Sequence, residues 1–501
     1  MTIPFIALVS SIAFGAESFE GQTFYIGDPH VHTGASADGG SSDLGVCKGS
    51  CGAVADLADS ARSYGLDWLS VTDHVNGRRT ADAQGFARVL EILLEAHDPD
   101  GGLVVLPGAE LRIDTPEGYL GHKNLYFAAD NKQWAEMNIN DLRYDGSSAV
   151  IADCDSLWTW MEDLEARWGD VMLLSHHPTR TNSMATAWDC HSGELAARFS
   201  PAVEIYSRHG DSMGCPAEHD DIPQGCASGS EVAVALDPEG LALKLSFIGG
   251  TDGHDTQPGS TCALDNVLTD HAYGGGLTVV VLDEQLDFDR SSLFDAIRQG
   301  STYATSGPLL PVMVDYSSQG ERLGGMGESI TLPSDQGLTI ELRLPAEHQS
   351  AVLGVDLVDP QGETAMTAMG DGTYRSELEP GVLPAWLYPR VEIDGLTWYD
   401  EPCEDGGQDY LEHLWISPVF LSMGAQDTGA PDTGTQDSET PGDTSTDSPP
   451  SDSEAPGDSG DDPDDSSCAA GCSQRGSTSA ALFILAMLGL GAAVRRGTSR
   501  V

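Results

Sequence analysis

Histidine and acidic residues in this sequence gather at the ends of short apolar runs. The run at positions 23–26 leads into Asp-Pro-His-Val-His, and a later run leads into Asp73-His74. Imidazole and carboxylate together suit Zn, Mn or Fe, whereas Ca or Mg would call for mostly oxygen ligands. Seven of the fourteen histidines lie at such positions, so the repetition predicts a centre for several divalent cations. The candidate ligands at these run ends are His30, His32, His74, Glu110, His122, His176, His177, Asp252 and His254.

Seven apolar runs of this kind come before residue 311, and helix-like stretches separate several of them. The stretches at 52–64, 81–96 and 155–168 are predicted helices. Strand alternating with helix favours a parallel sheet. Polar residues at the C-terminal end of every strand favour closure into a barrel, because an open sheet would collect them at one switch point. We therefore expect an α/β fold over residues 17–310, with a seven-stranded β/α barrel.

Residues 311–423 show a different pattern. Alternating or β-branched stretches such as LTIELRLP and AVLGVDLVD stand between Gly and Pro turns, which is typical of a small antiparallel β-sandwich. Only His348 and His413 are candidate ligands there. We expect this segment to pack against the barrel; carbohydrate binding is the alternative.

Both ends of the chain carry features of export. Residues 1–16 have a short apolar core followed by small residues, as a secretory signal peptide has. Residues 424–467 are acidic, without aromatic or basic residues, and predict a disordered linker. In the last segment, 468–501, the apolar run 480–494 would span about 22 Å, against a bilayer core of roughly 30 Å. The basic residues after it indicate a cytoplasmic end: Arg495, Arg496 and Arg500.

Charge and cysteine usage agree with an exported protein. A formal net charge of −55 excludes general binding to nucleic acid or anionic lipid, which needs clustered basic residues. Membrane contact is expected only through the C-terminal segment. The pairs Cys47/Cys51 and Cys215/Cys226 are predicted local disulfides, since neither has a second pair at zinc-finger spacing. The sequence leaves open the pairing of Cys154, Cys190, Cys262 and Cys403.

The motifs DPHVHT, VTDH, GAE, GHKNLYF, SHHP and GGTDGHD, in this order, resemble those of the PHP (polymerase and histidinol phosphatase) superfamily. They cover about residues 24–254. The stretch AIRQGSTYATSGPLLPVMVD that follows resembles the secreted branch with the CehA/McbA carbaryl-hydrolase-type metallohydrolases. The resemblance implies a distorted seven-stranded β/α barrel with two or three metal ions.

The resemblance also implies a ligand set. The first cation would be held by His30, His32, Glu110 and Asp252. The second would share Glu110 and add His122 and His177, with His176 as the alternative to His177. The third would be held by Asp38, His74 and His254. Asp28 would orient the ligands from behind.

The end of the chain, with Gly-Cys-Ser, an apolar helix and an arginine cluster, resembles a Myxo-type C-terminal sorting signal. This implies that a sorting protease acts at Cys472 and that the mature protein is on the cell surface, in the outer membrane or secreted. A plain single-span anchor is the alternative.

The chemistry expected of such a centre is hydrolysis. A carboxylate shared by two cations holds them about 3.5–4 Å apart, where one hydroxide bridges them at neutral pH. Glu110 and Asp252 are therefore expected catalytic residues. Phosphoester oxygens also need fixed cations. Arg112, Lys123, Arg180 and Arg208 follow strand ends, and pairing with nearby carboxylates is the alternative. Of the four we expect Arg180 at the substrate.

The leading hypothesis is an exported metal-dependent phosphoesterase acting on a small-molecule ester. Hydrolysis of a carbamate, carboxylic ester or amide is one alternative, motivated by GSTYATSGP, and a non-catalytic metal-binding surface protein is the other. His209 follows the sixth apolar run and is expected at most to line the substrate pocket. The remaining histidines are expected to be solvated: His97, His191, His219, His271, His348 and His413.

Overall fold

The computed structural model describes residues 16–44, 52–76, 83–115, 118–143, 151–180, 185–215, 226–259, 275–307, 309–394 and 411–424. All of them belong to one compact unit, Met1–Thr428. The predicted signal peptide, nearly all of the linker and the C-terminal segment with Cys472 lie outside the described residues. So do Cys47, Cys51, Cys262 and Cys403.

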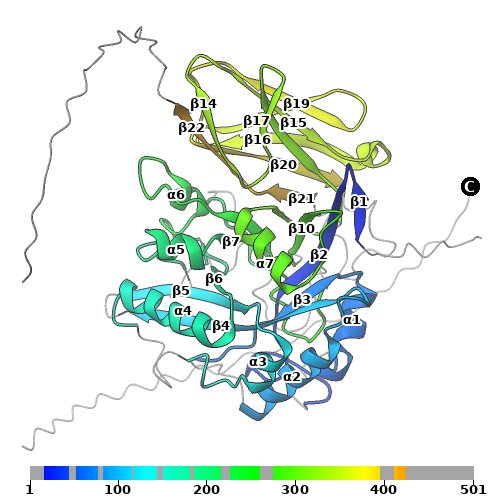
Figure 1. Ribbon diagram of the computed structural model, residues 1–501, viewed down its shortest axis with the longest axis vertical. Coiled ribbons are helices and arrows are strands. Elements are labelled where there is room, and N and C mark those ends of the chain that lie inside the picture. The colour runs from blue at the N-terminus through cyan, green and yellow to red at the C-terminus, as the bar shows by residue number, and fades with distance from the viewer. Residues whose placement is uncertain are drawn as a thin grey trace, which may run out of the picture. The chain divides into compact units, whose positions relative to one another are not determined.

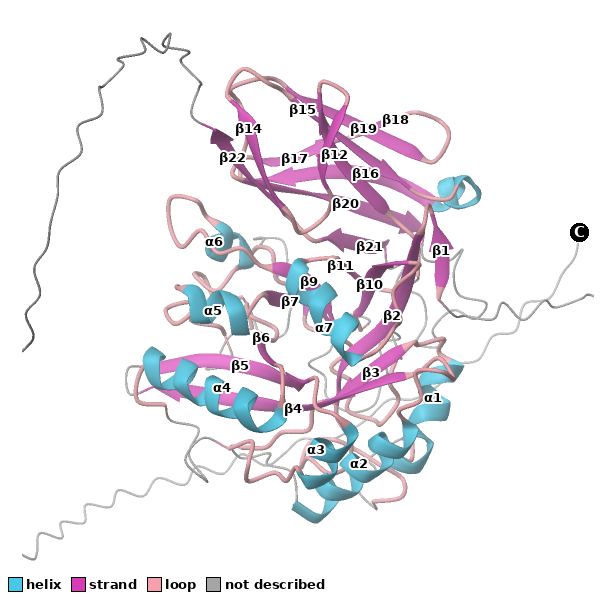
Figure 2. Ribbon diagram, in the orientation of Figure 1, coloured by secondary structure: helices cyan, strands magenta, loops and turns pink. Residues whose placement is uncertain are grey.

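The fold is α/β, as the alternating pattern predicts (Figures 1 and 2). The three predicted helices are present. They are the short η1 (Val54–Asp56) with α1 (Leu57–Ser63), then α2 (Ala83–Ala96) and α4 (Cys154–Trp168). Helix α4 begins where the Asp153 carboxylate accepts from Ser156 N, and it buries Leu157, Met161 and Leu164 at helical spacing. The other helices here are α3 (Asn131–Glu136), α5 (Glu194–Phe199), α6 (Val232–Leu236) and α7 (Arg290–Gln299).

Seven strands carry the polar ends that the sequence singles out: β2 (Gln22–Val31), β3 (Trp68–Val71), β4 (Val104–Thr115), β5 (Gly118–Phe127), β6 (Val171–Ser175), β7 (Ala202–Ser207) and β9 (Ser246–Gly249). Strands β2, β3 and β4 pair in parallel, and so do β6, β7 and β9. Strand β5 lies between these groups and is antiparallel to both β4 and β6. The expectation of a parallel sheet is therefore wrong at β5. Only two residues separate β4 from β5, too few for the crossover that parallel pairing needs.

The first and last strands of this series meet just beyond their C-terminal ends. A parallel bridge joins Val31 of β2 to Gly253, and His32 N donates to Gly253 O at 2.6 Å. A second parallel bridge joins His74 to Glu110. Residues more than two hundred positions apart are thus brought to one place.

Two further strands, β10 (Leu277–Asp283) and β11 (Thr302–Thr305), connect this part to the rest of the chain. Strand β10 is antiparallel to both β2 and β11. The small strands β1 (Glu17–Phe19) and β8 (Gly210–Asp211) pair with β2 and β7.

From residue 313 the described chain is almost entirely β-structure, as its pattern predicts. One sheet has the order β13 (Glu321–Gly324), β12 (Met313–Ser318), β15 (Leu338–Arg343), β19 (Thr373–Leu378) and β18 (Thr367–Ala368). The other strands are β14 (Ser329–Pro333), β16 (Val352–Asp359), β17 (Gly362–Ala365), β20 (Trp386–Asp394), β21 (Leu411–Ile416) and β22 (Val419–Gly424). Pairing is antiparallel except between β14 and β22. Tyr316 and Ile340 share a hydrophobic cluster with Val391, so both sheets enclose one core.

This C-terminal part is continuous with the strands that carry the polar ends. Strand β21 pairs antiparallel with β11. Trp415 on β21 stacks on Tyr206 of β7 at 4.7 Å between ring centroids, and its Nε1 donates to Asp211 Oδ2 at 3.0 Å. Asp211 lies in the hairpin after β7, so the C-terminal part supports the turn that contains Arg208 and His209.

Two disulfides lie among the described residues. Cys215–Cys226 is the predicted local bond, and Cys154–Cys190 ties the start of α4 to the segment before α5. Both suit an oxidising compartment. No helix within the described ranges has the length and hydropathy needed to span a bilayer.

Candidate metal centre

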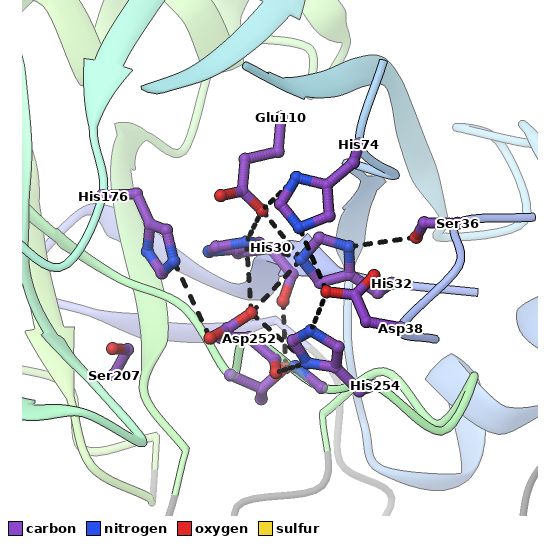
Figure 3. A network of polar contacts seen from close by, with 12 residues as sticks. His30, His32, Ser36, Asp38, His74, Glu110, His176, Ser207, Asp252 and His254 are labelled. Carbon is purple, nitrogen blue, oxygen red and sulfur yellow. Dashed lines mark hydrogen bonds and ion pairs between the residues drawn. The ribbon is translucent and has the colours of Figure 1, made fainter. Parts of the chain in front are cut away.

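Strand β2, strand β4 and the segment after β9 bring four side chains to one point, with Glu110 in the middle of β4 rather than at its predicted end (Figure 3). His30 and His32 project from the same side of the backbone because side chains alternate along a strand, and their Nε2 atoms are 3.2 Å apart. Glu110 Oε2 lies 3.5 Å from His30 Nε2 and 3.0 Å from His32 Nε2. Asp252 Oδ1 lies 3.4 Å and 3.2 Å from the same two atoms. All four residues are buried.

These spacings fit a shared cation. A tetrahedral ion with nitrogen and oxygen ligands at about 2.0–2.1 Å has ligand atoms roughly 3.3–3.4 Å apart. The five distances above, between two ring nitrogens and two carboxylate oxygens, all lie from 3.0 to 3.5 Å. Neutral imidazole and carboxylate are also the donor set that Zn, Mn and Fe accept. The described residues therefore include a buried group that could hold a metal ion.

Glu110 reaches a second group with its other oxygen. Its Oε1 contacts Nδ1 of His122, which lies on β5, and His177 follows β6 beside them. His177 is buried, and its Nδ1 has no hydrogen-bond partner. Its φ is 32°, and that of Asp252 is 51°, a region that non-glycine residues rarely adopt. Such backbone persists only where surrounding structure imposes it, and it is concentrated at functional sites.

A third group lies on the other side of His32. Asp38 Oδ2 is 3.2 Å from His74 Nε2 and 3.3 Å from His254 Nε2. The ring of His254 stacks on that of His32 at 4.2 Å. The structure thus brings together all nine predicted ligands, including Asp38, which belongs to a loop rather than a strand end.

Comparison with known proteins adds nothing to this geometry. No model of a known protein family matches the sequence, and no curated protein matches it. Membership of the PHP superfamily therefore stays a prediction, and the functional argument depends on the contacts in the site.

Two aspartates organise the backbone around the ligands. Asp73 accepts hydrogen bonds from Thr33 N and Ser36 Oγ at 2.8 and 2.6 Å, which fixes the loop after β2. Asp28 accepts from His30 N and from Thr251 Oγ1, so it ties β2 to the segment that contains Asp252. Asp28 thus acts on the backbone of His30 and on the hydroxyl of Thr251 rather than on a ligand ring. Burial raises the pKa of Asp28 to about 6, although these hydrogen bonds oppose the shift.

The electrostatics of the centre favour cations. Burial alone would lower the pKa of His30, but Asp252, Glu110 and Glu204 outweigh it and raise that pKa to about 10. Burial would raise the pKa values of Glu110 and Asp252, yet the surrounding histidines hold both well below their usual range. The buried carboxylates are therefore stabilised by positive charge beside them, as a site for divalent cations requires.

Glu204 is a site residue that the sequence reasoning missed. Its Oε2 accepts from His30 Nδ1 at 3.0 Å and its Oε1 from His176 Nδ1 at 2.6 Å. The signal was available, because a glutamate interrupts the apolar run AVEIY, and a buried carboxylate needs partners. His176 is thus held by Glu204, and His177 lies in the group with Glu110 and His122; its role as the ligand stays a prediction.

Of the four basic residues that follow predicted strand ends, Arg180 contacts the cluster directly. Its Nη1 lies 2.9 Å from His209 Nε2, and that nitrogen lies 2.7 Å from Asp252 Oδ2. Arg112 pairs with Asp114 at 3.1 Å, as the alternative predicts. Arg208 Nε donates to Thr251 O at 2.8 Å, which makes it a support for the Asp252 segment.

Lys123 does not face the cluster, so the expectation that it lies near a substrate is wrong. It alternates with His122 along β5, so it projects to the opposite face, where it is 1% exposed. Its Nζ donates to Ser175 Oγ at 2.7 Å and lies 3.4 Å from His191 Nε2. His191, expected to be solvated, is accordingly buried, because it lines the space around this amine. His97, His348 and His413 are partly exposed, and His219 and His271 lie outside the described residues.

Proposed function

We propose that this protein is a metal-dependent hydrolase that cleaves phosphoesters of small molecules, with two or three divalent cations at one end of a PHP-type barrel. The observation that carries the proposal is the set of four buried donor atoms of His30, His32, Glu110 and Asp252, spaced as the ligands of one ion are. The two further groups around it, one sharing Glu110, support a multinuclear centre.

The chain's own residues supply the positioning. Glu204 accepts from Nδ1 of both His30 and His176, which directs Nε2 of each ring to the centre as the nitrogen available to a cation. Arg180 provides a guanidinium at the edge of the cluster, suited to the nonbridging oxygens of a phosphoester. When bound, divalent cations would supply an activated water and neutralise charge on the ester. Glu110 and Asp252 would hold them, since the two oxygens of each carboxylate face different groups of histidines.

The barrel interpretation has support from strand order. Neighbours pair in the series β2, β3, β4, β5, β6, β7 and β9, and the Val31–Gly253 bridge links its two ends. Export is part of the same proposal, supported by the two disulfides and the acidic composition. The sorting signal stays a prediction.

Carbamate hydrolysis has less support. The segment that motivates it forms β11, and its Tyr303 is fully buried, with the hydroxyl donating to Leu310 O at 2.6 Å. This tyrosine packs in the core and is no substrate contact. The chemistry of the centre itself suits either bond, so the substrate panel must include both.

The test is hydrolysis of phosphomonoesters, phosphodiesters, carboxylic esters and aryl carbamates by protein stripped with EDTA and reloaded with Mn²⁺ or Zn²⁺. We expect phosphoester turnover that is absent after stripping and returns on reloading. Glu110→Gln should abolish it, whereas Glu412→Gln, which changes a buried glutamate in β21, should not. Turnover of carbamates alone would contradict the substrate class. Metal-loaded protein without any hydrolysis would favour a non-catalytic metal-binding protein.

A further inference from the structure

The two oxygens of the Asp252 carboxylate face different sets of nitrogens. Oδ1 lies near His30, His32 and His254, within the groups already described. Oδ2 faces the opposite way, 2.7 Å from His209 Nε2 and 3.7 Å from His176 Nε2. Glu110 has the same arrangement, with Oε2 on the His30 side and Oε1 on His122. Asp252 is thus placed to bridge in the way predicted for Glu110.

The histidines on the Oδ2 side form a group of their own. His176, His177 and His209 each offer one ring nitrogen, and these atoms lie within 4.8 Å of one another. The side chains of all three are almost wholly inaccessible to solvent. Glu204 already occupies His176 Nδ1, so the other nitrogen of that ring, Nε2, carries the lone pair on this side.

The contacts of His209 Nε2 cannot both be hydrogen bonds. Arg180 Nη1, 2.9 Å away, only donates, whereas the Asp252 carboxylate, 2.7 Å away, only accepts. If Nε2 has a proton, it faces the donor of Arg180; if it has a lone pair, it faces the oxygen of Asp252. A cation shared by His209 Nε2 and Asp252 Oδ2 removes the conflict, and the guanidinium then turns outward.

We propose that His176, His209 and Asp252 Oδ2 form an additional binding position for a borderline divalent transition-metal ion such as Zn²⁺, distinct from the three implied by the motifs. Two imidazoles and a carboxylate are a donor set for such ions, and three protein ligands leave a coordination position open. The position goes beyond the proposed function, although it rests on the same metal-binding character of Asp252. Arg180 competes with the ion for His209.

The test measures Zn²⁺ bound to the purified protein by equilibrium dialysis with elemental analysis. We expect His209→Ala to bind one ion fewer than the wild type. His348→Ala removes a partly exposed imidazole in the C-terminal part and should bind the wild-type number. Arg180→Met should bind the additional ion with a dissociation constant about tenfold lower, because a like charge is removed next to it. With Co²⁺, the visible absorption of the wild type should decrease in His209→Ala.

The outcomes separate this inference from the proposed function. Equal Zn²⁺ content in wild type and folded His209→Ala overturns the additional position but leaves the other three. Unchanged Zn²⁺ affinity in Arg180→Met overturns it as well, and does not depend on the folding of the alanine variant. A wild type that binds no Zn²⁺ overturns both.

Discussion

Glu204 gives the sharpest test of how the centre is built. It is 1% exposed and accepts from Nδ1 of His30 and of His176, one with each oxygen. Burial would raise its pKa, but these two histidines lower it to about 2, so it is an ionised acceptor at neutral pH. Glutamine at this position keeps the volume but has only one accepting oxygen. In Glu204→Gln one of the two rings must therefore face an N–H donor and change tautomer or turn.

The expected loss follows from the contacts. One hydrogen bond to a charged group contributes about 1.5–3 kcal/mol. Loss of a partner that orients a ligand histidine typically lowers metal affinity about 10- to 100-fold, which corresponds to roughly 1.4–2.7 kcal/mol. The two figures agree, so we expect Glu204→Gln to lower the affinity for the most tightly bound Zn²⁺ by about 10- to 100-fold.

The measurement is Zn²⁺ affinity by competition with a chromophoric chelator, with circular dichroism to show that the variant is folded. Glu412→Gln is the matched control, since it neutralises another buried glutamate far along the chain, in β21. Wild-type affinity in folded Glu204→Gln would refute the orienting role. Equal weakening in both variants would assign the effect to general destabilisation.

Three further predictions concern stability. Burial raises the pKa of Asp67 to about 7, so the stability that this group contributes is complete below about pH 4 and is lost as the pH rises towards 7. Asp67→Asn keeps an acceptor for Ile26 N and has no charge to bury. It should therefore raise the melting temperature more at pH 8 than at pH 4. The disulfide Cys154–Cys190 closes a loop of 36 residues. Replacing both cysteines with serine should lower the free energy of unfolding, measured with urea, by up to about 4 kcal/mol, and an unchanged urea midpoint would contradict this. Burial lowers the pKa of Lys123, so the stability of the wild type should rise from neutral towards alkaline pH. In Lys123→Met the melting temperature should no longer rise in this way, and the Zn²⁺ content should stay at the wild-type value.

Much of the site follows from the sequence because strand ends impose simple geometry. An alternating His30-x-His32 at the end of a buried strand presents both rings on one side, and neighbouring strand ends in a sheet meet. The buried face of α4 follows from helical spacing in the same way, with Trp158 buried and Trp160 only partly so. Local periodicity therefore carries over directly to the fold.

The sequence-based predictions fail where contacts between residues far apart in the chain determine the structure. The direction of β5 depends on a two-residue connection, and alternation on that strand directs Lys123 away from His122. Glu204 and His209 gain their roles from partners across the sheet rather than from neighbours in sequence. A basic residue next to a ligand in sequence is thus a poor guide to the substrate side, because adjacent residues on a strand face opposite ways.

The contact between Trp415 and the β7 hairpin has a consequence for timing. The chain is made, and would be exported, from its N-terminus, so β21 emerges more than a hundred residues after β11, its neighbour in the sheet. Until then Tyr206 lacks its stacking partner and Asp211 its indole donor. The turn that contains His209 therefore gains these two contacts only after β21 has been made, later than the strands that carry the other candidate ligands.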